Sequence, residues 1–266
     1  ESSKEQPEQS RLAVEWFANK LNKTIEQMDD HCSKFRLSDS LMCIYKFFWD
    51  DFCAWYLEIV KPAYGEKMDM QTYKATLGFF DALLKMLHPY MPFITEELWH
   101  ALEERADGET IMLQALPEAK PWSLKVEEAF DTAASAIMNI RSIRQSKGIS
   151  PKEPLQLLAK APFEPLMAPV ISKMANVSKV EVVEAFDPAE EGANCLVGTN
   201  EFFVPLNGLI DQKEERAKIE AEIAHLTKFL AGVNAKLSNQ KFVNNAPAAV
   251  VAVEKKKQSD ATLKLE

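Results

Sequence analysis

The segment Leu87–Leu102, LHPYMPFITEELWHAL, decides how the first part of this 266-residue chain folds. It is apolar at helical spacing, yet two prolines interrupt its first half. Proline disfavours helical geometry in the residue before it, so His88-Pro89 predicts the end of a helix. Pro92 suits the first turn of a helix, where a missing N–H costs nothing. The segment therefore predicts that one helix ends and another begins inside an all-helical bundle.

Two histidines and two glutamates in this segment raise the alternative of a catalytic cluster. His88 and His100 are separated by the predicted break, so neither ring is placed against the other. Glu96 and Glu97 instead fit a helix start, where negative charge is favourable. We interpret the segment as a helix break and restart. Its second helix is predicted to carry an apolar side made by Phe93, Ile94, Leu98 and Leu102, with Trp99 flanking that stripe.

The segments before this break predict three more helices. Ser10–Asp30 is amphipathic. Arg36–Gly65 is predicted to begin at an N-cap, Ser38, and to stop at Lys61-Pro62. Because it is apolar nearly all round, it is expected to be a central core helix. Met70–Leu87 is the helix that the break ends.

A basic stretch follows near the end of another predicted helix, Glu127–Lys147. Between Thr132 and Lys152 the sequence has four cations and no acidic residue. One interpretation is a solvated helix end, where cations complement the helix dipole. The other is a phosphate-binding patch, and the sequence leaves both open. The four cations are Arg141, Arg144, Lys147 and Lys152.

The pattern changes after Gly148. PLQLLAK and KVEVVEAF predict strands, MAPVISKMANV predicts a short helix between them, and CLVGTNEFFVPLNGLI predicts one or two further strands. These residues predict a small α/β insert in a mainly α chain.

The last part of the chain repeats apolar residues at heptad spacing. A seam over about three heptads predicts a helix that pairs along one side, and SNQKFVNNAP breaks it with turn-forming residues. A second arm begins near Val250, so the sequence predicts an antiparallel helical hairpin whose first arm is the longer. The seam residues are Ile219, Ile223, Leu226, Leu230, Val233 and Leu237.

Composition excludes several classes of protein. The chain is 47% hydrophobic and 27% charged, which is ordinary for a globular protein, and no run of apolar residues is long enough for a membrane span. The polar start of the sequence lacks the apolar core of a signal peptide, so we expect a cytoplasmic protein. Cys32, Cys43, Cys53 and Cys195 form no C-x-x-C pair or zinc spacing, which predicts free thiols and no metal site.

Net charge is −9, which by itself disfavours a nucleic-acid partner. The negative charge is concentrated before residue 132, however, and residues 211–266 carry a small positive excess. Binding of an anion depends on the face that is presented and not on the total charge.

Several stretches resemble a known family. HPYMPFITEELW resembles a helix common to class I aminoacyl-tRNA synthetases of the valine, isoleucine, leucine and methionine group. FRLSDSLMCIYKFFWDDFCAWYLEIVKP, NIRSIRQSKGISPKEPLQL and the stretch from VPLNGLIDQKEERAKIEAEI to NNAPAAVV are similar to valyl-tRNA synthetases. The last is the most specific, because it resembles the C-terminal coiled coil of those enzymes.

The resemblance also shows what is missing. The family's H-I-G-H and K-M-S-K-S signatures do not occur, nor does a Gly-rich phosphate turn, so we expect the C-terminal third of such an enzyme, without the catalytic and editing domains. ATP and Mg²⁺ are then expected for the full-length enzyme, and no cofactor for these residues. The chain begins after the N-A-x-R-F helix of the family, which puts its own anticodon specificity in question.

The resemblance implies a tRNA-binding function in three parts. Residues 1–147 would be the helical anticodon-binding domain, 148–210 a small α/β subdomain, and 211–266 a coiled-coil arm on the body of tRNA(Val). Phosphates require Lys and Arg, and unpaired bases stack on aromatic rings. The predicted contacts, chosen by charge and position, are Arg36, Arg141, Arg144, Lys147, Lys152, Arg216, Lys218, Lys228, Lys236, Lys241 and Phe242. Phe242 is equally compatible with plugging the hairpin tip.

A second hypothesis is a purely structural or protein-binding module, because heptads also suit pairing between chains. The predicted turn favours pairing within one chain and hence a monomer, although the short second arm leaves part of the seam uncovered for another molecule. A free-standing enzyme has little support, since no nucleophile–base pair, metal spacing or phosphate loop is present.

Overall fold

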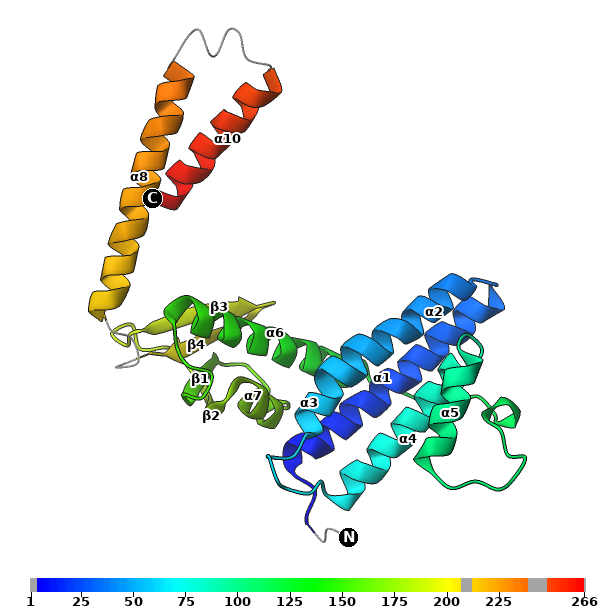
Figure 1. Cartoon of the computed structure of the whole chain (residues 1–266). Coiled ribbons are helices and arrows are strands. Elements are labelled where there is room, and N and C mark those ends of the chain that lie inside the picture. The colour runs from blue at the N-terminus through cyan, green and yellow to red at the C-terminus, as the bar shows by residue number, and fades with distance from the viewer. Residues whose placement is uncertain (1–3, 207–211, 239–247, 266) are drawn as a thin grey trace. The chain divides into compact units, whose positions relative to one another are not determined.

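The computed structural model describes residues 4–206, 212–238 and 248–265 (Figure 1). The chain divides into two compact units, residues 1–207 and 208–266, and each is described by itself. The first unit combines a helical bundle with a four-stranded sheet, so the prediction of a mainly α fold with a small α/β insert is confirmed.

The bundle is built from consecutive helices (Figure 1). They are α1 (Glu8–Ser33), α2 (Leu37–Lys46), the π-helix η1 (Phe47–Tyr56), α3 (Leu57–Val60), α4 (Met70–Leu87), α5 (Pro92–Leu102), the short 3₁₀ helix η2 (Ile111–Leu113) and α6 (Leu124–Lys147). The segments α2, η1 and α3 run on without a break and form the long helix predicted from Arg36, which ends before Lys61-Pro62 as expected. Ser38 is not its N-cap. Phe35 has a left-handed backbone and the Arg36 N–H donates to His31, so the helix begins already at Leu37.

The predicted break between α4 and α5 is confirmed. Helix α4 ends at Leu87, and Pro92 is the first residue of α5. His88 Nδ1 lies 2.8 Å from the Thr95 hydroxyl, and His100 Nε2 lies 3.1 Å from a carboxylate oxygen of Glu96. Each histidine thus has its partner in α5, and the two rings form no dyad.

Of the apolar side predicted for α5, Leu102 packs against the cluster that holds Trp99, and the other three residues do not. Trp99 is 2% exposed, whereas Phe93 is 91% exposed, and Ile94 and Leu98 also face outward. The indole N–H of Trp99 donates to Asp81 of α4 at 2.8 Å. Trp99 supplies both the largest apolar area and a hydrogen bond that the aliphatic stripe lacks, so it determines which face of α5 is buried.

The long helix is also less central than predicted. Ile44, Phe47, Phe52 and Tyr56 are buried, but Leu37, Leu41, Tyr45 and Trp49 form an exposed row at four-residue spacing, with Trp49 60% exposed. The helix is therefore buried on one side only. Composition could not reveal this, because both sides are equally apolar.

The described bundle is centred on Phe17 of α1, which is fully buried. Its ring lies 4.7 Å from Phe47, 4.8 Å from Tyr56 and 4.9 Å from Phe79, measured between ring centroids. Trp16 beside it stacks on Phe130 of α6 at 3.6 Å. Helix α1 therefore connects η1, α4 and α6 through aromatic contacts.

The α/β part follows α6 directly. Its elements are β1 (Leu155–Lys160), α7 (Ala168–Ala175), β2 (Val177–Val183), β3 (Gly192–Val197) and β4 (Asn200–Pro205). The strand order is β2-β1-β4-β3, with β1 and β2 parallel across α7 and β3 and β4 an antiparallel hairpin. Helix α6 packs on α7 as well as on the bundle, so the expected division at residue 147 falls within one compact unit.

The second unit is a hairpin of two helices, α8 (Gln212–Ser238) and α10 (Ala248–Leu265), that lie side by side in opposite directions (Figure 1). Of the predicted turn at 238–247, Ser238 is the last residue of α8, and residues 239–247 lie outside the described residues. Val233 of the seam is buried, and Asn234 accepts a hydrogen bond from Gln258 at 2.6 Å. Ile223, nearer the start of α8, is 49% exposed, as expected if the shorter arm leaves part of the seam uncovered.

No helix among the described residues has both the length and the apolar character that crossing a membrane requires.

We expect that Phe17→Ala lowers the free energy of unfolding by about 3–5 kcal/mol, because it removes a buried ring that several other rings contact. Urea unfolding followed by tryptophan fluorescence measures this loss. Phe93→Ala removes the same group from an exposed position and is expected to change stability by less than about 0.5 kcal/mol. Equal losses in the two variants would mean that α1 is not the centre of the bundle.

Candidate nucleic-acid interface

The cations of the predicted basic stretch lie where α6 ends and the chain turns into the sheet. Gly148 ends the helix in a left-handed conformation (φ 67°), and the Ile149 N–H donates back to Arg144 at 2.9 Å. The side chain of Ile149 is buried, which fixes the turn that follows. The end of α6 is therefore held in one geometry beside α7.

Arg144 is part of this junction and not of the surface. It is 5% exposed. Its guanidinium donates to the carbonyl oxygens of Ser150 at 2.8 Å, Ala175 at 3.0 Å and Asn176 at 3.1 Å. Burial lowers the pKa of this group, opposed by Glu153, but an arginine remains charged. Its predicted role as a surface phosphate contact is disfavoured, because its hydrogen bonds are used to join α6 to the end of α7.

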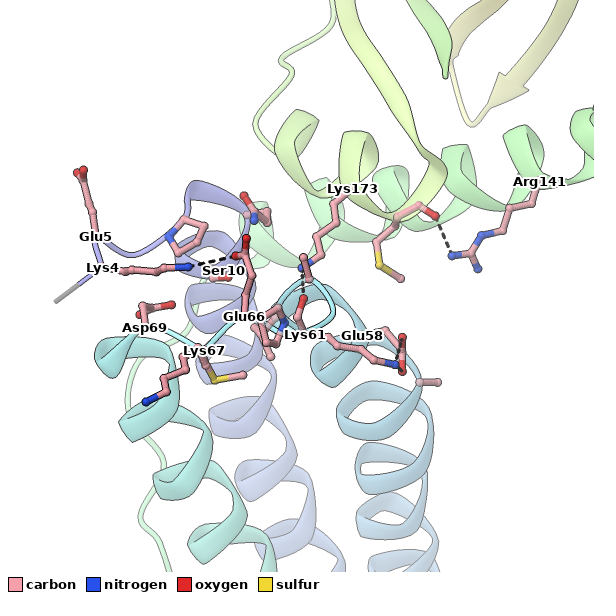
Figure 2. Close-up of a pocket in the computed structure, with 18 residues that line it drawn as sticks. Lys4, Glu5, Ser10, Glu58, Lys61, Glu66, Lys67, Asp69, Arg141 and Lys173 are labelled. Carbon is pink, nitrogen blue, oxygen red and sulfur yellow. Dashed lines mark hydrogen bonds and ion pairs between the residues drawn. The ribbon is translucent and has the colours of Figure 1, made fainter. Parts of the chain in front are cut away.

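Arg141, one turn earlier, is exposed. It donates to the Met174 carbonyl at 2.9 Å, so its guanidinium is anchored at the end of α7 while remaining accessible (Figure 2). The expectation that Arg141 and Arg144 share a face of the helix is confirmed, and both reach the same end of α7.

Lys173 is a cation of this region that the sequence did not indicate. It lies on α7, and its ammonium donates to the Lys61 carbonyl at 2.5 Å, which connects α7 to the end of α3 (Figure 2). Burial lowers the pKa of Lys173, and the nearby Glu58 carboxylate opposes part of that shift. A single lysine in a short helix gives no pattern, and its position depends on how α7 packs against the bundle.

Figure 2 shows the pocket of about 760 Å³ that Lys173 and Arg141 border. Most other charges in it are used locally. Lys4 pairs with Glu66 at 3.2 Å, and Lys61 with Glu58 at 3.3 Å. Asp69 caps α4 by accepting from the Thr72 N–H. Cations and carboxylates alternate along this pocket, so it has no strong preference for an anion.

The other bundle candidates lie on the surface. Lys152 is exposed, Lys147 is half-buried, and Arg36 pairs with Asp30 at 3.2 Å. Asp30 also pairs with Lys34. A hollow of about 800 Å³ beside α2 is lined by Asp30 and four other carboxylates, together with Lys20 and Lys46. Among the described candidates of the first unit, Arg36 lies beside α2 and the other four cations lie at or just after the end of α6.

Comparison with known proteins identifies the family to which this chain is similar. Residues 14–159 match the family model described as the anticodon-binding domain of tRNA ligase. The chain belongs to this family. Residues 211–266 match the model of the valyl-tRNA synthetase tRNA-binding arm.

Relatives agree with both matches. Valine–tRNA ligase of Porphyromonas gingivalis is 48% identical over 98% of the chain, that of Bacteroides fragilis 49% over 96%, and that of Chlorobaculum tepidum 31% over 94%. The chain spans about 30% of the length of these relatives. The resemblance to this family seen in the sequence is thereby confirmed.

The candidates in the tRNA-binding arm can be placed only in part. Lys228 and Lys236 are exposed on α8. Arg216 and Lys218 belong to α8, but the structure does not describe their side chains. Lys241 and Phe242 lie outside the described residues, so both interpretations of Phe242 remain predictions.

The anticodon-binding domain also has an acidic hollow, the one beside α2, whereas the end of α6 is basic. Asp51 of η1 lies in the hollow beside α2, and burial raises the pKa of its carboxyl to about 6, although Lys20 at 3.7 Å opposes the shift. This pKa exceeds the ordinary value of 3.8, so the folded state binds the proton more tightly than the unfolded chain. Ionisation of Asp51 therefore costs stability as pH rises from about 4 to 6.

We expect Asp51→Asn to stabilise the protein at pH 7.5 relative to its effect at pH 4, by about 1–3 kcal/mol, because the amide removes this cost of ionisation. Chemical denaturation of both proteins at the two pH values measures the difference. Asp50→Asn, an exposed neighbour, is the matched control. An effect of Asp51→Asn that is equal at both pH values would contradict the raised pKa.

Proposed function

We propose that this chain is the tRNA-binding portion of a valine–tRNA ligase, with the bundle directed to the anticodon and the arm to the body of tRNA(Val). The carrying observation is that two family matches, an anticodon-binding domain and a valyl-tRNA synthetase arm, occupy the two ends of one chain in that order. The relatives that span nearly the whole chain at up to 49% identity bear the same name, valine–tRNA ligase.

The proposal divides the work of such an enzyme. Attachment of valine to tRNA with ATP and Mg²⁺ is assigned to the part of the relatives that has no counterpart in these residues, and no cofactor is assigned to this chain. Its own contribution is positional. Binding energy from groups remote from the reacting atoms holds the acceptor end of a tRNA where the reaction takes place. We place this activity in the cytoplasm.

The experiment that tests the proposal is a salt titration of tRNA binding by the 266-residue chain, followed by fluorescence anisotropy. One tRNA carries a valine anticodon, and the other has the same body with a different anticodon. We expect affinity to fall steeply with salt, because each phosphate contact releases a counterion. A clear preference for the valine anticodon would place a reader within these residues.

The other outcomes separate the parts of the proposal. Equal, salt-sensitive binding of both tRNAs would mean that these residues hold the tRNA body and that specificity resides in the remainder of the enzyme. No binding at low salt would contradict the proposal that this chain binds tRNA by itself.

A second candidate function is association with another chain through the hairpin. The exposed Ile223 at a seam position is the observation that favours it. We nevertheless expect a monomer in sedimentation velocity at micromolar concentration, because Val233 and the Asn234–Gln258 bond already pair α8 with α10. A dimer that Ile223→Gln dissociates, and that Phe93→Ala leaves intact, would support the second candidate.

A further inference from the structure

A second hollow, of about 610 Å³, lies between the C-terminal end of α6, the turn at 148–151 and the C-terminal end of α7. Its described lining includes Arg141, Arg144 and Lys173 and contains no carboxylate and no aromatic ring. The chain as a whole has 40 acidic against 31 basic residues. The charged side chains of this lining are all cations, although the protein as a whole is acidic, and this favours an anion in the hollow.

The two accessible cations retain unused donors. Arg141 uses one of its five N–H groups to reach the Met174 carbonyl, and Lys173 uses one of three to reach the Lys61 carbonyl. These bonds hold the guanidinium of Arg141 on α6 and the ammonium of Lys173 on α7 in place at the border of the hollow. Binding an anion there requires little further ordering of either side chain, which reduces the entropic cost.

Arg144 adds charge beneath them. Its guanidinium is buried and held by three carbonyl oxygens, so it contributes a fixed positive charge that cannot move away from the hollow. It also satisfies the carbonyls of Ala175 and Asn176 at the end of α7. Arg141 therefore supplies a hydrogen bond to only one carbonyl at this end of α7, that of Met174, while Lys173 bonds the Lys61 carbonyl at the end of α3.

The lining also restricts the class of anion. Nucleic-acid bases are held by stacking on aromatic rings and by edge contacts, and the hollow offers no ring. Guanidinium and ammonium groups suit phosphate oxygens. A volume of about 610 Å³ falls in the range of ligand pockets and accommodates a phosphate with its sugar.

We propose that Arg141 and Lys173 bind backbone phosphates of the tRNA in this hollow. The inference rests on the proposed function and deepens it by naming one site and the chemical group that it takes. Phosphate contacts position a nucleic acid without reading its sequence. The site therefore orients the tRNA between the anticodon-binding bundle and the α/β part, independently of which anticodon is present.

The test compares the salt dependence of tRNA binding for the 266-residue chain and for Arg141→Gln, Lys173→Gln and the double variant. Each single variant is expected to lower the slope of log affinity against log salt by about 1, and the double variant by about 2. At low salt the double variant is expected to bind about tenfold or more weakly, to the same extent for both anticodons. Arg141→Lys keeps the charge and is expected to restore most of the slope.

Lys74→Gln, an exposed lysine of α4 away from the hollow, is the matched control for loss of one positive charge. Thermal unfolding shows which variants remain folded at the assay temperature. If the Lys173 variants unfold, the slope measured for Arg141→Gln alone tests the inference, because Arg141 is exposed and its replacement is expected to leave the fold intact. Slopes that are unchanged in Arg141→Gln, or changed equally in Lys74→Gln, would overturn the inference and leave the proposed function intact. Absence of tRNA binding by the unaltered chain would overturn both.

Discussion

The arrangement of this tRNA ligase domain depends on one buried guanidinium. Arg144 reaches from α6 to the carbonyl oxygens of the turn at Ser150 and of the α7 terminus at Ala175. A buried charge without hydrogen bonds is very costly, so these partners must stay in place for the protein to fold. The same bonds set the distance between α6, which belongs to the bundle, and α7, which packs against β2 of the sheet. Arg141 and Lys173 acquire their positions from that junction.

Charge is distributed so that opposite characters occupy different parts of one acidic unit. The hollow beside α2 collects carboxylates, with Asp51 buried enough to hold its proton up to about pH 6. The charged residues that line the hollow at the α6–α7 junction are cations. A polyanion approaching such a unit is repelled from the first region and attracted to the second, which selects an orientation before any close contact forms. Net charge alone gave no indication of this.

Local chemistry made the elements predictable. His88-Pro89 and Pro92 placed the α4–α5 break, and the change of pattern after Gly148 placed the sheet, because proline and strand alternation act over a few residues. Faces were harder. Trp99 and the stripe at Phe93 and Ile94 compete for burial, and the hydrogen bond from Trp99 to Asp81 that settles the choice joins residues of different helices.

The region of the candidate site was predictable from the sequence, but the roles of its individual residues were not. Four cations without an acidic residue pointed to the end of α6 at which the candidate site lies, and this pattern is a property of the sequence itself. The separation of Arg144 as a buried tie from Arg141 as an accessible donor depends on where α7 packs, and Lys173 enters only through that packing. The residue pattern of one segment does not predict where another segment packs against it. For this reason sequence located the region, while the division of roles among its cations required the fold.

Two weak modules on one chain bind a large ligand better than either does alone, since engagement of one raises the effective concentration of the other. Under the function proposed above, phosphate contacts at the junction would add binding energy without adding sequence information. Under that proposal, a base-specific contact at the junction would have to match every tRNA that is bound, whereas a phosphate contact is the same in all of them. Specificity can then be confined to the anticodon, and the cations at the end of α6 need only supply orientation.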